Sequence, residues 1–386
     1  MKYEHEPKYK NHSKPQNEIA DDLLNSDIAL EEMTASLKSM QNSKSGGPDA
    51  FVNEILKINS QEIIPILRLI FNNILNSKEI PWNISWMVPL YKNGDKNELS
   101  SYRCINLSSC IEKLLTKIIK TRLTKFSDKY NIISPLQSGF RKENSVIDNI
   151  YILKEIIAVY KNKKQPLYLC FIDLSKAFDS IPIDRLKMKL RKTLPECKLL
   201  SLIIALLDNK QYEVLYDGDR TQSFRLNNGI PQGDSMSPIL FNLYINDLLD
   251  CFDESVQNND PVILEDVKLS ILIYADDILL MSQSKEGVIK QIKEVQNYCD
   301  NNGLKINFNK TKIMIRNEKL KYSNLKLSTK AGTNIIDVVE DYKYLGMWIS
   351  KSNKKTYRRF GKERYKIILH HCKDVKRIRK HQWLPP

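Results

Sequence analysis

The chain has 386 residues, 42% of them hydrophobic, so it is long enough to bury a large core. Its formal net charge of +14 favours an acidic partner such as nucleic acid. No stretch approaches the roughly 20 apolar residues of a membrane span, and the N-terminus lacks the apolar region of a secretion signal. Seven cysteines without a Cys-x-x-Cys pair are typical of reduced thiols and exclude a zinc site of that kind. We therefore expect an intracellular protein with no membrane partner.

The first third of the chain predicts helices. Segment 1–27 is polar and charged, and helical periodicity begins over 28–40. Ser109 and Glu112 match a capping box, which predicts the start of another helix there. Its apolar residues recur at helical spacing, a pattern more typical of packing than of a functional surface.

Asp173 directly follows the apolar run 167–172, which predicts a strand buried on both faces. Pro182 then opens an amphipathic helix over 183–190, and Asp217-Gly218-Asp219 predicts a hairpin further on. Asp173 should therefore lie where a strand leads into a helix. The simpler alternative is a solvated carboxylate at a strand end.

The segment Gly229–Pro238 combines two glycines with a predicted helix N-terminus. Ser237 is the expected N-cap, Pro238 the first helical residue, and the apolar stretch 239–249 follows. Such a loop lets the backbone approach a phosphate or sugar closely. An ordinary turn before a helix is the alternative.

Two adjacent carboxylates, Asp276 and Asp277, lie between the apolar runs 270–273 and 278–281, which predicts a β-hairpin with acid at its tip. Adjacent carboxylates repel each other beside a buried sheet unless a cation neutralises them, and a divalent metal is the natural candidate. Successive strand residues point to opposite faces, so a third carboxylate is needed, and Asp173 can supply it. A plain acidic turn remains the alternative at this point.

Seven ordered segments together resemble the reverse transcriptases of non-LTR (LINE-type) retrotransposons, over about residues 28–350. They are VPLYKNGDKNELSSYRCINL (88–107), LQSGFRKENSVIDNI (136–150), FIDLSKAFDSI (171–181), GIPQGDSMSPILFNLYINDLL (229–249), YADD (274–277), GLKINFNKTKIM (303–314) and YKYLG (342–346). The specificity of the resemblance lies in this order rather than in any one segment.

The resemblance implies an α+β fold, the right-hand polymerase. After the N-terminal segment 1–27, it implies fingers at 28–165, a palm with an antiparallel sheet plus helices at 166–346, and a short or truncated thumb from 347–386. The implied activity is RNA-directed DNA polymerase, with dNTPs, an RNA template and a DNA primer as partners. Asp173, Asp276 and Asp277 would be both catalytic residues and ligands of two Mg²⁺ ions, because all three offer hard oxygen ligands.

The resemblance also implies groups that meet the incoming nucleotide: Lys92, Arg103, Phe178, Gln232 and Gly233. Lys92 and Arg103 would contact the triphosphate. Phe178 would exclude a 2′-hydroxyl, which makes the enzyme selective for deoxyribose, although a core aromatic is the alternative for this residue. Gln232 would line the nucleotide pocket. Either Lys310 or Lys312 could protonate the leaving pyrophosphate, and the sequence does not decide between them.

Other residues are implied to hold the nucleic acid. Arg141 would contact the template, and the turn Tyr344-Leu345-Gly346 would hold the primer. Residues 351–386 contain 13 lysines or arginines against two acidic residues, interleaved with Tyr357, Phe360 and Tyr365. We expect this segment to begin the thumb that grips the duplex, and a disordered basic tail is the alternative.

Two rival functions remain open from the sequence. One is a non-catalytic nucleic-acid-binding remnant of such a polymerase, and the other is an RNA-copying RNA polymerase with a similar palm. Elements of this class generally carry an endonuclease, for which this chain has no room, so another chain could supply it. The resemblance further leads us to expect a monomer that acts in the nucleus.

Overall fold

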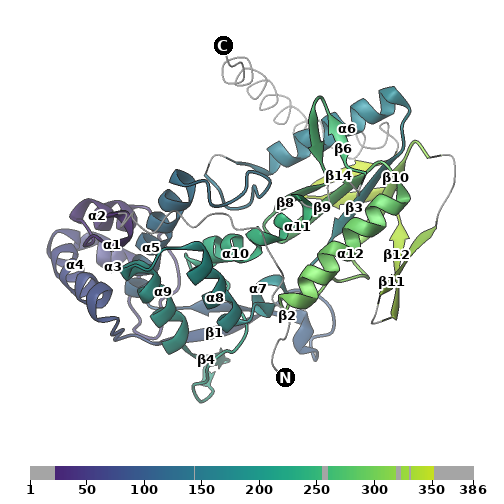
Figure 1. Cartoon of the computed structure of the whole chain (residues 1–386). Coiled ribbons are helices and arrows are strands. Elements are labelled where there is room, and N and C mark those ends of the chain that lie inside the picture. Colours follow the sequence, from purple (N-terminus) through teal and green to yellow (C-terminus); the bar gives the residue numbers. More distant parts are fainter. Residues whose placement is uncertain (1–21, 143, 254–259, 319–322, 330–331, 352–386) are drawn as a thin grey trace, which may run out of the picture. The chain divides into compact units, whose positions relative to one another are not determined.

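The computed structural model describes residues 22–142, 144–253, 260–318, 323–329 and 332–351. They form two compact units, each assembled from segments that are distant in sequence (Figure 1). The first unit contains the described residues of 1–134 and 176–247, and the second contains those of 135–175 and 248–386. The division into fingers, palm and thumb stays a prediction.

The first unit is mostly helical. Its helices are α1 (Asp22–Asn25), α2 (Leu30–Lys38), α3 (Asn53–Ile58), α4 (Ser60–Ser77), α5 (Cys110–Lys129), α7 (Ala177–Ser180), α8 (Ile183–Thr193), α9 (Lys198–Asn209) and α10 (Ser237–Ile245), with a 3-10 turn at Leu99–Ser101. Helix α5 is central: Leu114, Leu115 and Leu123 are fully buried. The stripe predicted for this helix is therefore core, as its periodicity indicated.

A buried arginine ties α5 to the start of the described chain. Arg122 is 1% exposed and pairs with Glu32 of α2 at 2.6 Å. Its remaining donors reach the carbonyl oxygens of Ser26 at 2.7 Å and Asp27 at 3.0 Å. Because a guanidinium buried without acceptors is costly, these bonds fix how α1 and α2 pack on α5.

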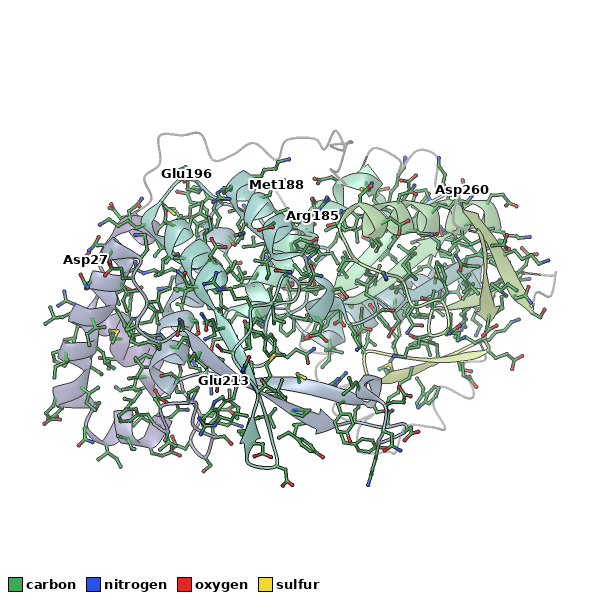
Figure 2. All side chains as sticks on the ribbon, turned by 90° about the horizontal axis from the view of Figure 1, so that it is seen from below. Asp27, Arg185, Met188, Glu196, Glu213 and Asp260 are labelled. Atoms are coloured by element: carbon green, nitrogen blue, oxygen red, sulfur yellow. The ribbon has the colours of Figure 1, made fainter. Side chains whose placement is uncertain are left out.

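The first unit also holds a four-stranded sheet in the order β2-β1-β4-β5. Its strands are β1 (Ile84–Tyr91), β2 (Tyr102–Leu107), β4 (Gln211–Tyr216) and β5 (Asp219–Arg220). Strands β1 and β4 are parallel, and Trp86 Nε1 of β1 donates a hydrogen bond at 3.3 Å to Glu213 of β4. Glu213 is labelled in Figure 2. The predicted hairpin at Asp217-Gly218 joins β4 to β5, and both turn residues have positive φ.

Two sequence expectations in this unit are wrong in detail. Ser109 does cap α5, accepting a bond from the Ile111 amide, but Glu112 pairs with buried Lys210 instead of closing a capping box. Burial raises the pKa of Glu112, and Lys210 opposes that rise. Helix α10 begins at Ser237 with Met236 as its N-cap, because the Ser237 hydroxyl donates to the Pro231 carbonyl at 2.7 Å instead of capping the helix.

The second unit is built on a six-stranded sheet in the order β11-β12-β10-β3-β9-β8. The strands are β3 (Leu167–Ile172), β8 (Ile271–Tyr274), β9 (Asp277–Ser282), β10 (Lys312–Arg316), β11 (Asn324–Thr329) and β12 (Gly332–Val338). Two short hairpins accompany it: β6 (Val262–Leu264) with β7 (Val267–Leu269), and β13 (Asp341–Tyr344) with β14 (Met347–Ser350). Its helices are α6 (Val146–Lys163), α11 (Asp250–Asp253) and α12 (Lys285–Asn301), and a 3-10 turn at Asn246–Leu248 leads in from the first unit.

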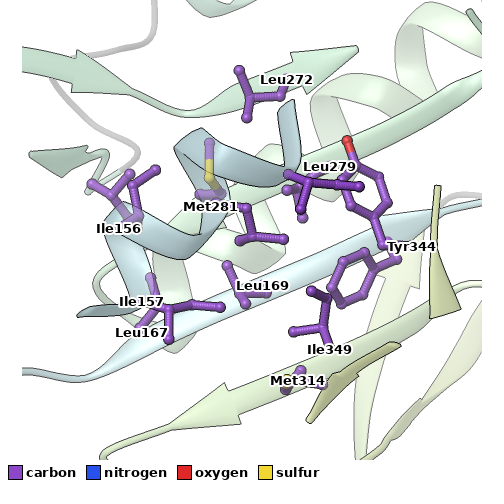
Figure 3. Packing of buried hydrophobic residues seen from close by; sticks show 14 of the residues in the cluster. Ile156, Ile157, Leu167, Leu169, Leu272, Leu279, Met281, Met314, Tyr344 and Ile349 are labelled. Carbon is purple, nitrogen blue, oxygen red and sulfur yellow. The ribbon is translucent and has the colours of Figure 1, made fainter. Parts of the chain in front are cut away.

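The core of this unit joins α6 to one face of the sheet. Leu167, Leu169 and Phe171 alternate along β3 into a buried cluster with α6 residues (Figure 3). Tyr344 and Ile349 of the β13–β14 hairpin belong to the same cluster. Every residue of β3 is buried, and α12 packs against β3 and β9 in front of the sheet (Figure 1), as expected for a strand covered on both faces.

Candidate functional site

Asp173 lies where the sequence places it, directly after the buried strand β3 in the second unit. Its amide donates to Thr311 Oγ1 at 3.3 Å, and its carbonyl accepts from the Asn307 amide at 2.8 Å. These backbone bonds fix the residue at the end of the sheet while its side chain stays one-third exposed. A carboxylate held this way can meet a ligand from solvent.

Asp276 and Asp277 lie at the tip of the β8–β9 hairpin, as predicted. Tyr274 pairs with Asp277, so Ala275 and Asp276 form a two-residue turn. Ala275 has φ +56° and Asp276 does not have positive φ, the sign pattern of a type II′ turn. This turn usually places glycine at its first central position, which Ala275 occupies here.

The three carboxylates are close enough to affect one another electrostatically. Burial, then the charges of Asp276 and Asp173, raise the pKa of Asp277 to about 6. Burial and then the charges of Asp277 and Asp173 raise the pKa of Tyr342 to about 12. The end of the sheet therefore concentrates negative charge, which a cation would relieve.

The two candidate lysines have different surroundings. Lys310 Nζ lies 3.9 Å from Asp173, and its side chain is 65% exposed. Lys312 Nζ instead pairs with Asp337 at 2.6 Å on the neighbouring strand β12. Of the two, Lys310 is the one that the structure brings to the carboxylates.

The donor chemistry of this group fits Mg²⁺, because all three side chains offer hard carboxylate oxygens whose mutual repulsion a divalent ion would neutralise. The spatial arrangement of the three side chains, however, does not yet form a metal site. Among the described residues, no three His, Cys, Asp or Glu side chains are arranged to hold one ion. Metal binding would thus require the three carboxylates to converge further.

The turn implied to hold the primer belongs to the same unit. Tyr344 pairs with Met347, so Leu345 and Gly346 form the two-residue turn of the β13–β14 hairpin. Both have positive φ, the sign pattern of a type I′ turn, in which glycine is favoured. Tyr344 is 2% exposed, its ring centroid lies 5.5 Å from that of Phe171, and burial raises its pKa. The hairpin is therefore anchored to the strand that ends in Asp173.

The remaining candidate of the second unit, Arg141, lies in the half-buried loop that precedes α6. Phe140, beside it, has φ +60° and is 49% exposed. Of the basic and aromatic residues expected in the thumb, Lys351 is exposed, and the others, including Tyr357, Phe360 and Tyr365, lie outside the described residues.

The first unit brings together two groups implied to meet the nucleotide, Phe178 and Gln232. The Phe178 ring stacks on Phe241 with centroids 4.5 Å apart, and its carbonyl accepts from the Ile230 amide at 3.0 Å. The carbonyl of Gln232 accepts from the Asn106 amide of β2 at 2.9 Å. Gly233 has φ +103°, and an added Cβ would lie 3.2 Å from the Asn106 carbonyl, so close packing and conformation both favour glycine there.

Asp179 links these residues, and sequence reasoning did not single it out. Its Oδ1 accepts from Gln232 Nε2 at 3.2 Å. Partial burial raises the pKa of Asp179, and Gln232, Lys176 and Arg103 oppose that rise. Arg103 is exposed on β2, and exposed Lys92 lies just after β1, its amide donating to the Ser101 carbonyl at 2.9 Å. The signal in the sequence that could have identified Asp179 was an acidic residue directly after Phe178.

The comparisons with known proteins place the chain in a family. A family model described as reverse transcriptase (RNA-dependent DNA polymerase) matches residues 92–349, more than half of the chain. The chain therefore belongs to the reverse transcriptase family, with mixed helical and strand content and sheets rich in antiparallel pairing. Together with the retrotransposon relatives described next, this match confirms the resemblance to non-LTR retrotransposon polymerases inferred from the seven segments.

Several insect retrotransposon proteins are similar to this chain. The probable RNA-directed DNA polymerase from transposon BS of Drosophila melanogaster is 28% identical over 293 residues, which cover 74% of this chain and 32% of that protein. The polymerase from mobile element jockey of the same species is 23% identical over 343 residues, covering 86% of this chain and 36% of that protein. A Pol polyprotein from element R2 of Popillia japonica is 24% identical, covering 74% and 39%. The chain thus spans about a third of the length of these relatives.

In the described part of the chain, no helix is long and apolar enough to span a bilayer.

Proposed function

We propose that this chain is an RNA-directed DNA polymerase that extends a primer 3′-hydroxyl with dNTPs on an RNA template. The observation that carries the proposal is the gathering of Asp173, Asp276 and Asp277 at one end of the sheet. Burial, and then the charges of Asp276 and Asp173, raise the pKa of Asp277. These three carboxylates come from two distant segments, and a bound cation would neutralise their combined negative charge. Such a cluster supports the polymerase function because the chain belongs to the reverse transcriptase family.

In this proposal Asp173, Asp276 and Asp277 hold two Mg²⁺ ions. When bound, these ions supply activation of the primer hydroxyl and stabilisation of the leaving pyrophosphate. The chain's own part is to keep the three carboxylates in place at the end of the sheet. Lys310, 3.9 Å from Asp173, is the candidate donor of a proton to the pyrophosphate.

The residues of the first unit would bind and orient the nucleotide. Arg103 and Lys92 are exposed cations suited to the triphosphate. The Phe178 ring, held against Phe241, would occupy the space that a 2′-hydroxyl needs. Gln232 would line the pocket, with its side-chain amide oriented by Asp179.

The wider organisation belongs to the same proposal. We assign residues 28–165 to fingers, 166–346 to the palm and 347–386 to the start of a thumb. Arg141 would contact the template, and Tyr344-Leu345-Gly346 would hold the primer. We also propose that the protein acts as a monomer in the nucleus.

One observation favours the alternative, a catalytically inactive nucleic-acid-binding remnant. The described residues contain no three metal-ligating side chains arranged around one point. If the carboxylates cannot converge, the basic chain would still bind template and primer through its charge, with the strong salt dependence typical of phosphate contacts.

Primer extension by the purified chain separates the two functions. The experiment uses an RNA template with a DNA primer and compares the parent with Asp276→Ala and with Asp266→Ala, a control in the exposed turn between β6 and β7. We expect Asp276→Ala to lose at least about a thousandfold in extension rate, because a metal site contributes several kcal/mol to the transition state. Asp266→Ala should match the parent, and all three proteins should bind template–primer alike. Binding without extension by the parent would instead establish the remnant.

A further inference from the structure

The acidic hairpin carries a conformation that its own residues do not favour. Ala275 has φ +56°, which residues with a Cβ rarely adopt, and it directly precedes Asp276 and Asp277. Ala275 is only 5% exposed, so other parts of the unit cover this residue of the turn. Something outside the hairpin must therefore hold the turn in place.

The side chain of Gln137 binds both polar backbone groups of Ala275. Gln137 Oε1 accepts a hydrogen bond from the Ala275 amide at 2.9 Å, and Gln137 Nε2 donates to the Ala275 carbonyl at 3.3 Å. The same Oε1 accepts from the Gly139 amide at 2.9 Å, which fixes the glutamine side chain itself. Gln137 is fully buried, so water does not compete for these bonds.

The backbone around Gln137 is attached to the same strand. Gln137 and Ile273 form a parallel bridge at the edge strand β8. The Ser138 amide donates to the Ile273 carbonyl at 2.9 Å, and the Ile273 amide donates to the Leu136 carbonyl at 3.0 Å. Asn149 of α6 adds a bond to the Ile273 carbonyl at 3.3 Å and accepts one from the Ser138 hydroxyl at 2.9 Å. The position of the glutamine is thus fixed by the sheet and by a helix.

The segment 136–139 approaches Ala275 so closely that Gly139 leaves no space for a side chain. A Cβ added at Gly139 would lie 2.2 Å from the Ala275 nitrogen. The segment 136–139 is therefore shaped to lie against the acidic turn, and Gly139 makes this possible.

We propose that Gln137 is a positioning residue that holds Ala275 in its left-handed conformation and so fixes Asp276 and Asp277 relative to Asp173. The inference rests on the proposed polymerase function. Only a primary amide of this length offers an acceptor and a donor to the two groups of one peptide residue. Glutamate would set a second acceptor against the Ala275 carbonyl, and methionine would fill the space without bonding.

The first test compares Gln137→Met with Gln291→Met. Gln291 is also fully buried, and its Nε2 donates to the Met281 carbonyl at 2.8 Å, near the other end of β9, so it controls for loss of a buried glutamine. We expect Gln137→Met to lower the maximal single-nucleotide extension rate about 30- to 100-fold while leaving template–primer Kd within about twofold. Gln291→Met should stay within about threefold of the parent in both.

Rescue separates positioning from general structural support. Glycine adopts positive φ freely, so adding Ala275→Gly to Gln137→Met should restore about tenfold of the lost rate. If the double variant is no faster than Gln137→Met, or if both methionine variants lose rate equally, the positioning role is wrong.

Amide hydrogen exchange tests, without any substrate, whether Gln137 holds the turn at Ala275. In Gln137→Met the Ala275 amide should exchange at least about tenfold faster, whereas the Ile273 amide, bonded to the Leu136 carbonyl, should keep its protection. If the parent extends no primer, the polymerase proposal fails while exchange still decides whether Gln137 holds the turn. Unchanged exchange at Ala275 would overturn the inference.

Discussion

Replacing Gly139 by alanine should slow catalysis without unfolding the protein. The added Cβ would lie 2.2 Å from the nitrogen, 2.9 Å from the Cα and 3.0 Å from the Cβ of Ala275. Real Cβ contacts are essentially never shorter than 3.0 Å, so the segments must separate by about 1 Å. Backbone atoms bonded into the sheet cannot rotate away as a flexible side chain could. The displacement therefore passes to the turn that carries Asp276 and Asp277.

The size of the effect follows from this displacement. A misplacement of about 1 Å in reacting groups costs on the order of 100-fold in rate, equivalent to about 2.7 kcal/mol in activation free energy. We expect the single-turnover rate of nucleotide addition to fall by this factor, with template–primer Kd unchanged.

The matched control is Gly218→Ala in the β4–β5 turn. An added Cβ there meets no atom within 4 Å, although φ is +88°. This variant reports the general cost of replacing a glycine, and its extension rate should stay within about threefold of the parent. Our reasoning is refuted if Gly139→Ala extends primers as fast as Gly218→Ala while melting at the same temperature.

Three further predictions follow from named contacts. Phe178→Val should admit ribonucleotides by opening the space beneath the sugar, and an unchanged dNTP to rNTP preference in single-nucleotide assays would remove Phe178 from the site. Because the pKa of Asp277 is raised to about 6, its metal-binding carboxylate form falls from about nine-tenths at pH 7 to about one-tenth at pH 5. The Mg²⁺ concentration for half-maximal rate should therefore rise about tenfold as pH falls, and equal midpoints would contradict this. Glu112→Gln leaves the Lys210 ammonium without its buried partner and should lower the free energy of unfolding in urea by about 3–5 kcal/mol. Asp184→Ala should cost about 0.5 kcal/mol, because Asp184 is exposed and its partner Lys187 also pairs with Asp208. A loss below about 1 kcal/mol for Glu112→Gln would be inconsistent with the buried pairing.

Local patterns in the sequence were enough to predict where the acidic residues lie. Asp173 ends an uninterrupted apolar run whose length and composition are typical of a strand covered on both faces, and the structure confirms such a strand. Asp276 and Asp277 follow a short apolar run and precede another, so a hairpin was the simplest solution. In both cases the pattern that carries the prediction lies within a few residues of the carboxylates, although distant strands and helices complete the burial of β3.

Contacts between distant segments could not be predicted from such local patterns. Gln137 and Ala275 are 138 residues apart, and a glutamine before Ser-Gly looks like any loop residue. Glu112 matched a capping box by its spacing from Ser109, yet its carboxylate pairs with Lys210 at the C-terminal end of α9. Ser237 matched an N-cap, but the carbonyl of Pro231 competes for its hydroxyl. Tertiary partners outweigh local preference at each of these positions.

The central claim is that the three carboxylates catalyse DNA synthesis on RNA, and its most direct test is the rate of first nucleotide addition as Mg²⁺ is varied. The experiment uses the purified chain, an RNA template with a DNA primer, and Asp173→Ala beside the parent. We predict addition by the parent that rises with Mg²⁺ and stops when the ion is chelated, and no addition by Asp173→Ala despite equal template–primer binding. Addition by Asp173→Ala at the parental rate, or none by the parent at any Mg²⁺ concentration, would contradict the claim.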